Sequence, residues 1–310
     1  MPHKLYALPP AYRCLCWALL LAALAAVQGL LCAWAGESAH RNQTTGLRFA
    51  QPLTQAQIKA VYEMPPETAG NITASFWGQT TGTVTAEPAR RAEGVVCIAY
   101  CGSADDCLPV LYENGTAPGA VGRQCAVSAG LARQLFGSAD VVGLAVVHGR
   151  ERYHISGVFR AEDAVLLYPG TGGYTCAELR GVSADTPKAD AEQWCAAAGL
   201  GAPQCIVYGP QRAWLASVVS CLPLALCVLG GAFLLLRASL RWPPLARQGA
   251  WLAGALALAC LLPAALQALP GWLIPARWSD FSFWERLVEQ IRTADHAWQA
   301  AVRYWRDIAL

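Results

Sequence analysis

The sequence predicts an α+β extracytoplasmic domain, together with about three transmembrane helices and a C-terminal amphipathic helix. Hydrophobic residues make up 55% of the 310 positions and charged residues only 14%, whereas soluble globular chains average about 25% charged residues. The shortage of charge is concentrated in three long apolar runs, which is typical of membrane spans. The polar stretch after the first run has the size of one domain. It mixes strand and helix patterns without a strict βα repeat, which favours α+β.

The first apolar run covers residues 14–35 and contains no charged residue. A helix of this length can cross the hydrocarbon core of about 30 Å. Lys4 and Arg13 precede it, so we expect residues 1–13 to form a cytoplasmic N-terminus. A cleaved signal peptide is the alternative, because Ala33 and Ala35 form an A-x-A cleavage pattern. Both interpretations export residues 36–212.

The second and third runs, residues 213–236 and 249–270, form a pair separated by a short basic loop. This loop, residues 237–248, contains three arginines and no acid, so the positive-inside rule places it in the cytoplasm. Neither run contains a charged residue, which argues against an ion or proton pathway through these helices. The sequence therefore predicts a multi-pass protein of the cell membrane whose main domain is extracytoplasmic.

Residues 271–310 form a predicted extracytoplasmic tail. From Phe283 to Ile308 apolar residues, several of them Trp, recur at helical spacing on one face, and Ser279 or Asp280 could cap the helix. Such a helix could lie in the membrane interface, pack on the exported domain or pack on a partner's helices. The sequence leaves these three interpretations open.

Capping residues and strand patterns mark the elements of the exported domain. Thr54 begins a helix that ends before Pro65, and Ser128 and Gly137 bracket a second helix. Alternating or β-rich patterns predict strands at 71–85, 174–182 and 206–208, a hairpin spans 144–159, and Pro187 begins a helix that ends near Gly199.

Two blocks of this domain resemble the periplasmic core domain of MacB/FtsX-type ABC transporter permeases. Residues 125–143 contain a helix ending LARQLFG followed by SADVVG, and residues 148–159 contain a glycine turn and the strand YHISGVF. The resemblance implies that the helix buries one face, that glycines end it and turn the chain, and that the strand supplies buried positions. The matching residues are Leu131, Leu135, Phe136, Gly137, Gly143, Tyr153, Gly157 and Val158.

The resemblance implies a non-catalytic, permease-like membrane subunit of an ABC system. Such a subunit transmits conformational change between a separate cytoplasmic ATPase and its extracytoplasmic domain. A homodimer or a related permease subunit and membrane lipid are the other expected partners. Two departures stand out: these permeases have four spans, whereas the sequence shows three, and the G-x-x-x-x-G-K-[ST] motif of a built-in ATPase is absent.

Two other functions stay open: a stand-alone membrane-anchored binding or sensing module, and an exported enzyme. The sequence has neither H-E-x-x-H nor G-x-S-x-G, so we predict no catalytic site. Among the 13 cysteines, Cys101 and Cys107 could close a small loop as a disulfide in an oxidising compartment. The spacing of Cys97, Cys101 and Cys107 does not match a usual zinc pattern, and we predict neither a metal nor a cofactor. A net charge of +2 gives no reason to expect nucleic acid as a partner.

Overall fold

The computed structural model describes residues 10–65, 67, 70–86, 90–119, 122–183, 185–267, 269–275, 277, 280 and 282–309. Most of the predicted cytoplasmic N-terminus and the candidate cap Ser279 lie outside these residues. The chain divides into two compact units. The helical unit comprises Met1–His40 and Gln211–Ile274, and the sheet unit comprises Arg41–Pro210 and Pro275–Leu310. The tail therefore belongs to the same unit as the predicted exported domain.

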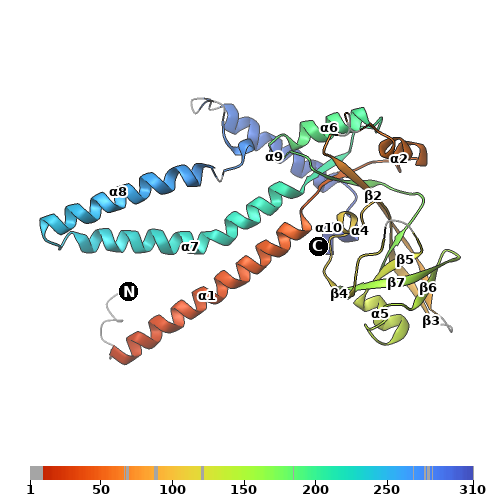
Figure 1. Cartoon of the computed structure of the whole chain (residues 1–310), viewed down its shortest axis with the longest axis horizontal. Coiled ribbons are helices and arrows are strands. Elements are labelled where there is room, and N and C mark those ends of the chain that lie inside the picture. Colours follow the sequence, from red (N-terminus) through yellow and green to blue (C-terminus); the bar gives the residue numbers. More distant parts are fainter. Residues whose placement is uncertain are drawn as a thin grey trace. The chain divides into compact units, whose positions relative to one another are not determined.

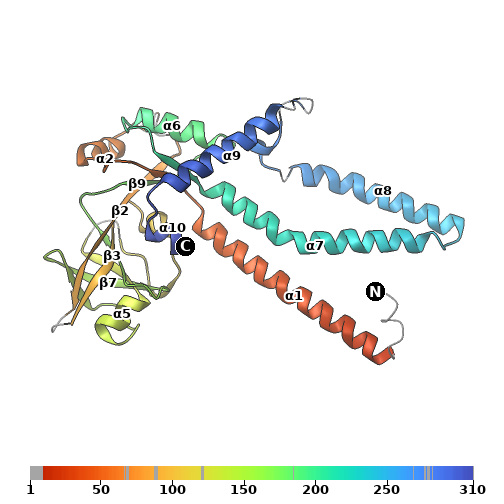
Figure 2. The ribbon, with the colours of Figure 1, turned by 180° about the vertical axis from the view of Figure 1, so that it is seen from behind.

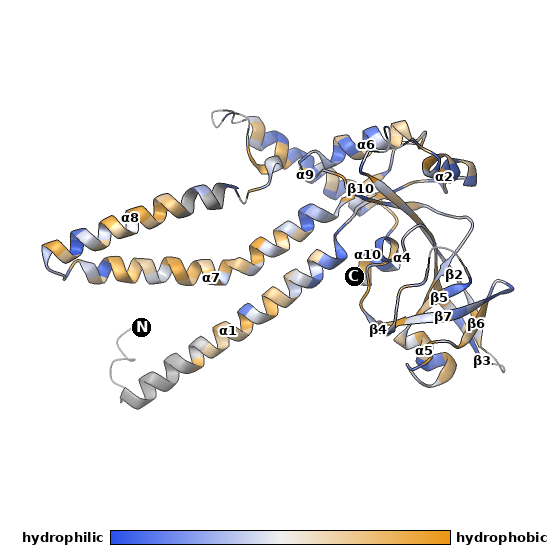
Figure 3. Cartoon of the chain, in the orientation of Figure 1, coloured by the Kyte–Doolittle hydropathy of each residue, from blue (hydrophilic) through white to orange (hydrophobic). Residues whose placement is uncertain are grey.

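The helical unit consists of three long helices and a short 3-10 helix. Their bounds are α1 (Pro10–Arg41), α7 (Gly209–Ser239), α8 (Pro244–Gln267) and the 3-10 helix Gly271–Leu273. Figure 1 shows α7 and α8 as a hairpin, and Figure 3 shows hydrophobic residues along most of α7. Within the described residues one helix, α7, is long and apolar enough to cross a membrane. The spans expected in α1 and α8 stay predictions.

Polar side chains connect the three helices of this unit. Gln28 of α1 donates a hydrogen bond from Nε2 to the Ser220 carbonyl of α7, at 2.9 Å. Trp251 of α8 donates from Nε1 to the Ser239 hydroxyl of α7, at 3.1 Å. In an apolar environment such bonds hold helices in register, since the groups would otherwise be unsatisfied.

The sheet unit mixes helices and strands, as predicted. Its helices are α2 (Gln55–Tyr62), α4 (Ala104–Cys107), α5 (Ala129–Phe136), α6 (Pro187–Ala197), α9 (Ser282–Ala300) and α10 (Trp305–Ala309). Its strands are β1 (Thr45–Arg48), β2 (Thr73–Ala86), β3 (Arg90–Cys101), β4 (Tyr112–Gly115), β5 (Gln124–Ser128), β6 (Ala145–His148), β7 (Glu151–Phe159), β8 (Val165–Pro169), β9 (Cys176–Arg180) and β10 (Cys205–Tyr208).

The described strands form one ten-stranded sheet in the order β10-β1-β9-β2-β3-β8-β5-β7-β4, and β6 bridges β2 and β7. The pairings β2–β3–β8–β5–β7–β6–β2 therefore close a ring, which encloses one apolar cluster with α5 against it. The long strand β2 continues out of this ring to pair with β9. There Phe76 packs in a second cluster with residues of α2 and α6.

The helix of the resemblance motif has the predicted shape. The Ser128 hydroxyl accepts a hydrogen bond from the Leu131 amide at 3.1 Å and caps α5. Leu131 and Leu135 are fully buried and Phe136 packs beside them. Gly137 ends the helix with φ at +79°, a left-handed conformation that glycine adopts without a steric penalty.

The predicted hairpin is also present as β6 and β7, which pair antiparallel. Gly143 turns the chain into it with φ at +89°, and Tyr153 and Val158 are buried. Gly157 allows a close approach, because a Cβ atom there would lie 2.4 Å from the Thr116 carbonyl oxygen.

The tail differs from the single helix that its periodicity predicts. The structure ends α9 at Ala300 and begins α10 at Trp305, with non-helical chain between them. Arg306 is buried in the sheet unit, and the break lets the chain enter that interior. Helix α9 contacts β10, which corresponds to the interpretation in which the tail packs on the domain.

Candidate functional site

Two long helices join the sheet unit through neighbouring strands. Strand β1 follows α1 after a connection of a few residues, and α7 begins directly after β10. The two strands pair antiparallel, with Thr45 opposite Tyr208 and Arg48 opposite Cys205. A Cβ atom on Gly209 would lie 2.2 Å from the Thr44 carbonyl oxygen, so the two connections touch. The two long helices are therefore connected by the chain to the same strand pair.

A buried carboxylate lies one strand away from this junction. Glu178 of β9 is 1% exposed. It accepts hydrogen bonds from the Arg48 guanidinium at 3.0 Å, the Trp77 indole at 3.0 Å and the Thr44 hydroxyl at 2.8 Å, and it forms an ion pair with the Arg306 guanidinium at 2.5 Å. A buried carboxylate requires this kind of saturation, because an unpaired charge in the interior is strongly destabilising.

The second carboxylate comes from the tail. Asp307 accepts a hydrogen bond from the second Arg48 terminal nitrogen at 2.8 Å. The guanidinium carbons of Arg48 and Arg306 lie 5.0 and 5.5 Å from the centroid of Trp77, within cation–π range. The positive charges of the two guanidinium groups and the negative charges of the two carboxylates thus cancel around the buried Trp77 indole. We call Arg48, Trp77, Glu178, Arg306 and Asp307 the buried charge cluster.

The electrostatics of Arg48 follow from this arrangement. Burial by itself lowers the pKa of Arg48, but Cys176, Glu178 and Asp307 act in the other direction, and the net pKa lies above its ordinary value. Arg48 therefore stays charged at every pH at which the protein folds, and the cluster depends on its two carboxylates for neutrality.

Aromatic residues beside the cluster fix the tail on the sheet unit. The hydroxyls of Tyr304 and Thr175 lie 2.7 Å apart. Trp305 donates from its amide to Gln79 Oε1 and from its indole to Asp163 Oδ2, both at 2.8 Å. Arg306 also donates to the carbonyl at the end of α4, at 2.8 Å, and Figures 1 and 2 both show α10 beside α4.

The sequence did not reveal this cluster. Its members come from β1, β2, β9 and α10, and strand pairing brings them together. One signal was present in the sequence: Glu178 and Arg48 are charged residues inside short apolar segments. A strand that is buried on both faces cannot accommodate an unpaired charge, so each of these residues requires a partner.

The candidate disulfide is not formed in the structure. Cys101 and Cys107 are both free thiols, and the Cys107 thiol donates to the Phe76 carbonyl oxygen at 3.4 Å. Burial raises the pKa of Cys107 well above its ordinary value. The pairing of these two cysteines stays a prediction. In the part of the chain that the structure describes, no three His, Cys, Asp or Glu side chains gather as metal ligands.

One thiol–imidazole pair has the composition of a nucleophilic site. The Cys97 thiol lies 3.8 Å from His148 Nδ1. Nδ1 also lies 3.1 Å from the Thr83 carbonyl, to which it donates when it carries the proton. Burial raises the pKa of Cys97 to about 11, whereas an activated thiol needs a lowered pKa. This pair is therefore a buried structural contact.

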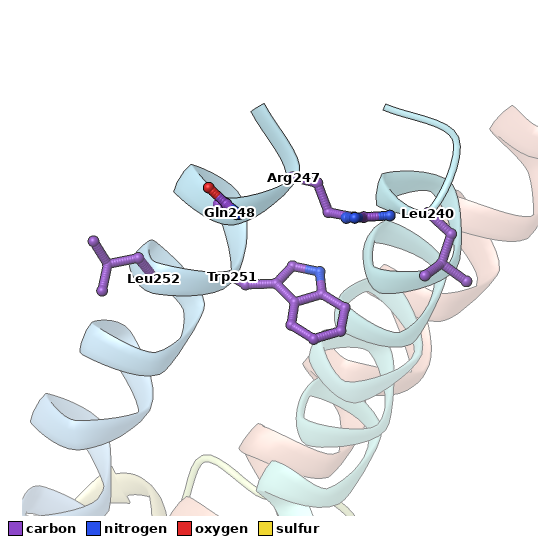
Figure 4. Close-up of a pocket in the computed structure, with 5 residues that line it drawn as sticks. All are labelled: Leu240, Arg247, Gln248, Trp251 and Leu252. Atoms are coloured by element: carbon purple, nitrogen blue, oxygen red, sulfur yellow. The ribbon is translucent and has the colours of Figure 1, made fainter. Parts of the chain in front are cut away.

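In the helical unit, the loop between α7 and α8 presents an open hollow of about 550 Å³. Leu240, Arg247, Gln248, Trp251 and Leu252 line it, as Figure 4 shows. The loop is shorter than the predicted 237–248: Arg241 lies in it, whereas Arg237 lies in the last turn of α7 and Arg247 in the first turn of α8. Leu240 and Leu252 are largely exposed. A basic rim around apolar side chains has the composition of a protein-contact surface.

No protein-family model and no curated protein matches this chain. Two of the solved structures to which the chain is similar are an extracellular domain and a periplasmic region. The extracellular domain of the transporter YknZ from Gram-positive bacteria is 13% identical, with a TM-score of 0.41 over 49% of this chain and 90% of that domain. The periplasmic region of MacB from Actinobacillus actinomycetemcomitans is 11% identical, with a TM-score of 0.43 over 54% of this chain and 89% of that region.

Proposed function

We propose that this chain is a non-catalytic, permease-like subunit of an ABC system. It spans the cell membrane three times, through α1, α7 and α8. It transmits conformational change between a separate cytoplasmic ATPase and the extracytoplasmic sheet unit. The motif residues of α5, β6 and β7 support the proposal through their resemblance to the permease family.

The pairing of β1 with β10 is the observation that carries the proposal. Because α1 leads into β1 and β10 leads into α7, both helices are connected to adjacent strands without a flexible linker. Pairing by backbone hydrogen bonds is stiff along the strand direction. Movement of the helices is thereby passed to the sheet rather than absorbed by a loop.

The basic loop between α7 and α8 is the contact proposed for the ATPase. Arg237, Arg241 and Arg247 attract an acidic partner surface, and the exposed Leu245 and Trp251 supply apolar contact area. Charge reversal in this loop should therefore weaken ATPase binding more than the same change elsewhere on the surface.

Copurification from native membranes in mild detergent tests the proposal. We expect an ATPase subunit to copurify with the tagged full-length chain. With the double variant Arg241→Glu/Arg247→Glu, the amount of copurified ATPase should fall at least about tenfold. Arg91→Glu, an exposed change in the sheet unit, is the matched control and should retain it. Purification without any ATPase would contradict the proposal and favour a stand-alone binding or sensing module.

Topology is tested separately in intact cells. Leu245→Cys places a thiol at an 84% exposed position in the first turn of α8, and Glu93→Cys places one in the sheet unit at a side chain that is 72% exposed. A membrane-impermeant maleimide should label position 93 and leave position 245 unlabelled. The opposite pattern would place the sheet unit in the cytoplasm and overturn the proposed arrangement.

A further inference from the structure

Helix α10 and the residue before it, Tyr304, are held in the way that a protein holds a peptide ligand. Residues 304–307 make dense side-chain contacts, whereas the flanking Val302 and Ile308 are 66% and 72% exposed. In the described part of the sheet, every strand comes from residues 45–208, so the tail adds no strand. The tail therefore contributes side-chain contacts to the sheet unit without being part of its backbone ladder.

We propose that the sheet unit contains a peptide-binding groove that recognises an aromatic–aromatic–Arg–Asp segment, and that residues 304–307 occupy it as a releasable ligand supplied by the same chain. The groove is formed by Arg48, Trp77, Asp163, Thr175 and Glu178. This inference concerns the sheet unit alone and holds whether or not the chain works with an ATPase.

Each residue of the segment has its own partner in the groove. Glu178 binds the arginine and Arg48 binds the aspartate, at 2.5 and 2.8 Å. The Thr175 hydroxyl meets the tyrosine hydroxyl, and Asp163 accepts from the tryptophan indole. The Tyr304 ring also packs edge-on against Trp77, with centroids 5.3 Å apart. Because four neighbouring positions of the segment each contact a different group, the groove is selective for the sequence of the peptide that it binds.

The charge balance permits the segment to leave. Arg306 and Asp307 enter as one positive and one negative charge, so the docked segment is neutral. When they leave, Arg48 and Glu178 still pair at 3.0 Å, and the Trp77 indole still donates to Glu178. Asp163 is exposed and solvated, so neither the filled nor the vacant groove holds an unbalanced buried charge, and release avoids the large cost of leaving a single buried ion.

Release would free α10 from the sheet unit, whereas α9 keeps its contact with β10. With the segment docked, both helices of the tail are held on the sheet unit. With the segment released, only the C-terminal end of the tail is free. The groove therefore controls whether α10 is held on the sheet unit.

The test begins from the full-length folded chain. A specific protease site is inserted between Val302 and Arg303, which are both exposed, and the detergent-solubilised protein is cleaved after folding. A fluorescent synthetic peptide with the sequence of residues 303–310 is then added, and its anisotropy is measured. We expect the cleaved segment to exchange and the peptide to bind saturably.

Variant peptides test the recognition without changing the protein. Arg306→Met in the peptide should weaken binding at least about tenfold, because the groove then keeps two carboxylates against one cation when Asp307 docks. Ile308→Ala is the matched control and should bind like the native peptide, since this side chain is exposed. Equal binding of the Arg306→Met peptide, or a cleaved segment that never exchanges, would overturn the proposal.

Thiol labelling distinguishes release from unfolding. Arg306 covers the carbonyl of the fully buried Cys107, whereas Cys125 is buried in the ring of strands. After cleavage and washing, labelling of Cys107 should rise while Cys125 stays unlabelled. Simultaneous labelling of both would mean that the tail is a part of the folded core rather than a ligand, and would overturn the proposal.

Discussion

The substitution Glu178→Gln tests the energetics of the buried charge cluster most directly. Glutamine keeps the size of glutamate and one acceptor oxygen, but it removes the negative charge that Arg48 and Arg306 share. The interior then holds two guanidinium groups and only one carboxylate, Asp307. Removal of one partner from a buried ion pair costs about 3–5 kcal/mol. The amide oxygen can still accept from the Trp77 indole, and the amide nitrogen can donate to the Thr44 hydroxyl oxygen, so we expect the lower end, about 3 kcal/mol.

Urea unfolding of the full-length chain in detergent, followed by tryptophan fluorescence, measures this change. At a slope of about 2–3 kcal/mol/M, a loss of 3 kcal/mol lowers the midpoint by about 1–1.5 M. The matched control is Glu162→Gln, whose side chain is 86% exposed and pairs with Arg133 at 2.9 Å. A surface pair contributes about 0–1 kcal/mol, so the control should shift the midpoint little.

A double variant refines the same test. Arg306→Met and Asp307→Asn each leave one unbalanced charge, whereas the two together restore neutrality. We expect the double variant to lose about 1–3 kcal/mol less than the sum of the two single variants. Strict additivity, or a Glu178→Gln midpoint equal to that of Glu162→Gln, would refute the electrostatic reasoning.

Three further predictions concern other parts of the chain. Gly209→Ala should disturb the junction of β10 with α7, because a Cβ there would lie 2.2 Å from a backbone oxygen. The rate of amide hydrogen exchange in β1 should rise. The control Gly230→Ala has open space around it and should leave this rate unchanged. Leu131→Ala should lower the free energy of unfolding by about 2–5 kcal/mol in the urea assay, because it leaves a cavity under α5; a loss below 1 kcal/mol would contradict its full burial. Burial raises the pKa of Cys125 to about 12, so this thiol is protonated at pH 8 and peptide mapping should find it unlabelled by maleimide. The partly exposed Cys101 should be labelled in the same experiment. If Cys101 is labelled only after a reducing agent is added, the predicted disulfide is present.

Elements with local signals were predictable from the sequence. Helix α5 is bracketed by Ser128 and Gly137, which each act on the backbone within a few residues, and the structure has both caps where they were expected. The helix from Gln55 to Tyr62 likewise begins at the capping residue Thr54. Caps and turns depend on neighbouring residues, so one sequence contains the information needed to place them.

Features that depend on distant partners were not predictable. Strands β1, β3, β4, β5 and β8 were missed. Residues of β1, β4, β5 and β8 become strand through pairing with segments far away in the chain. The break between α9 and α10 was missed for a related reason. The apolar spacing continues past Ala300, and only the burial of Arg306 shows why the helix stops. The groove was not predicted because the strands that form it and the segment that occupies it lie far apart in the sequence.

The bond between Arg48 and Asp307 joins positions 259 residues apart, and this separation sets an order of assembly during synthesis. Strand β1 is synthesised long before α10, so until α10 has emerged from the ribosome Glu178 has one arginine partner instead of two. The buried charge cluster is therefore completed late in the assembly of the sheet unit, after its strands have been synthesised.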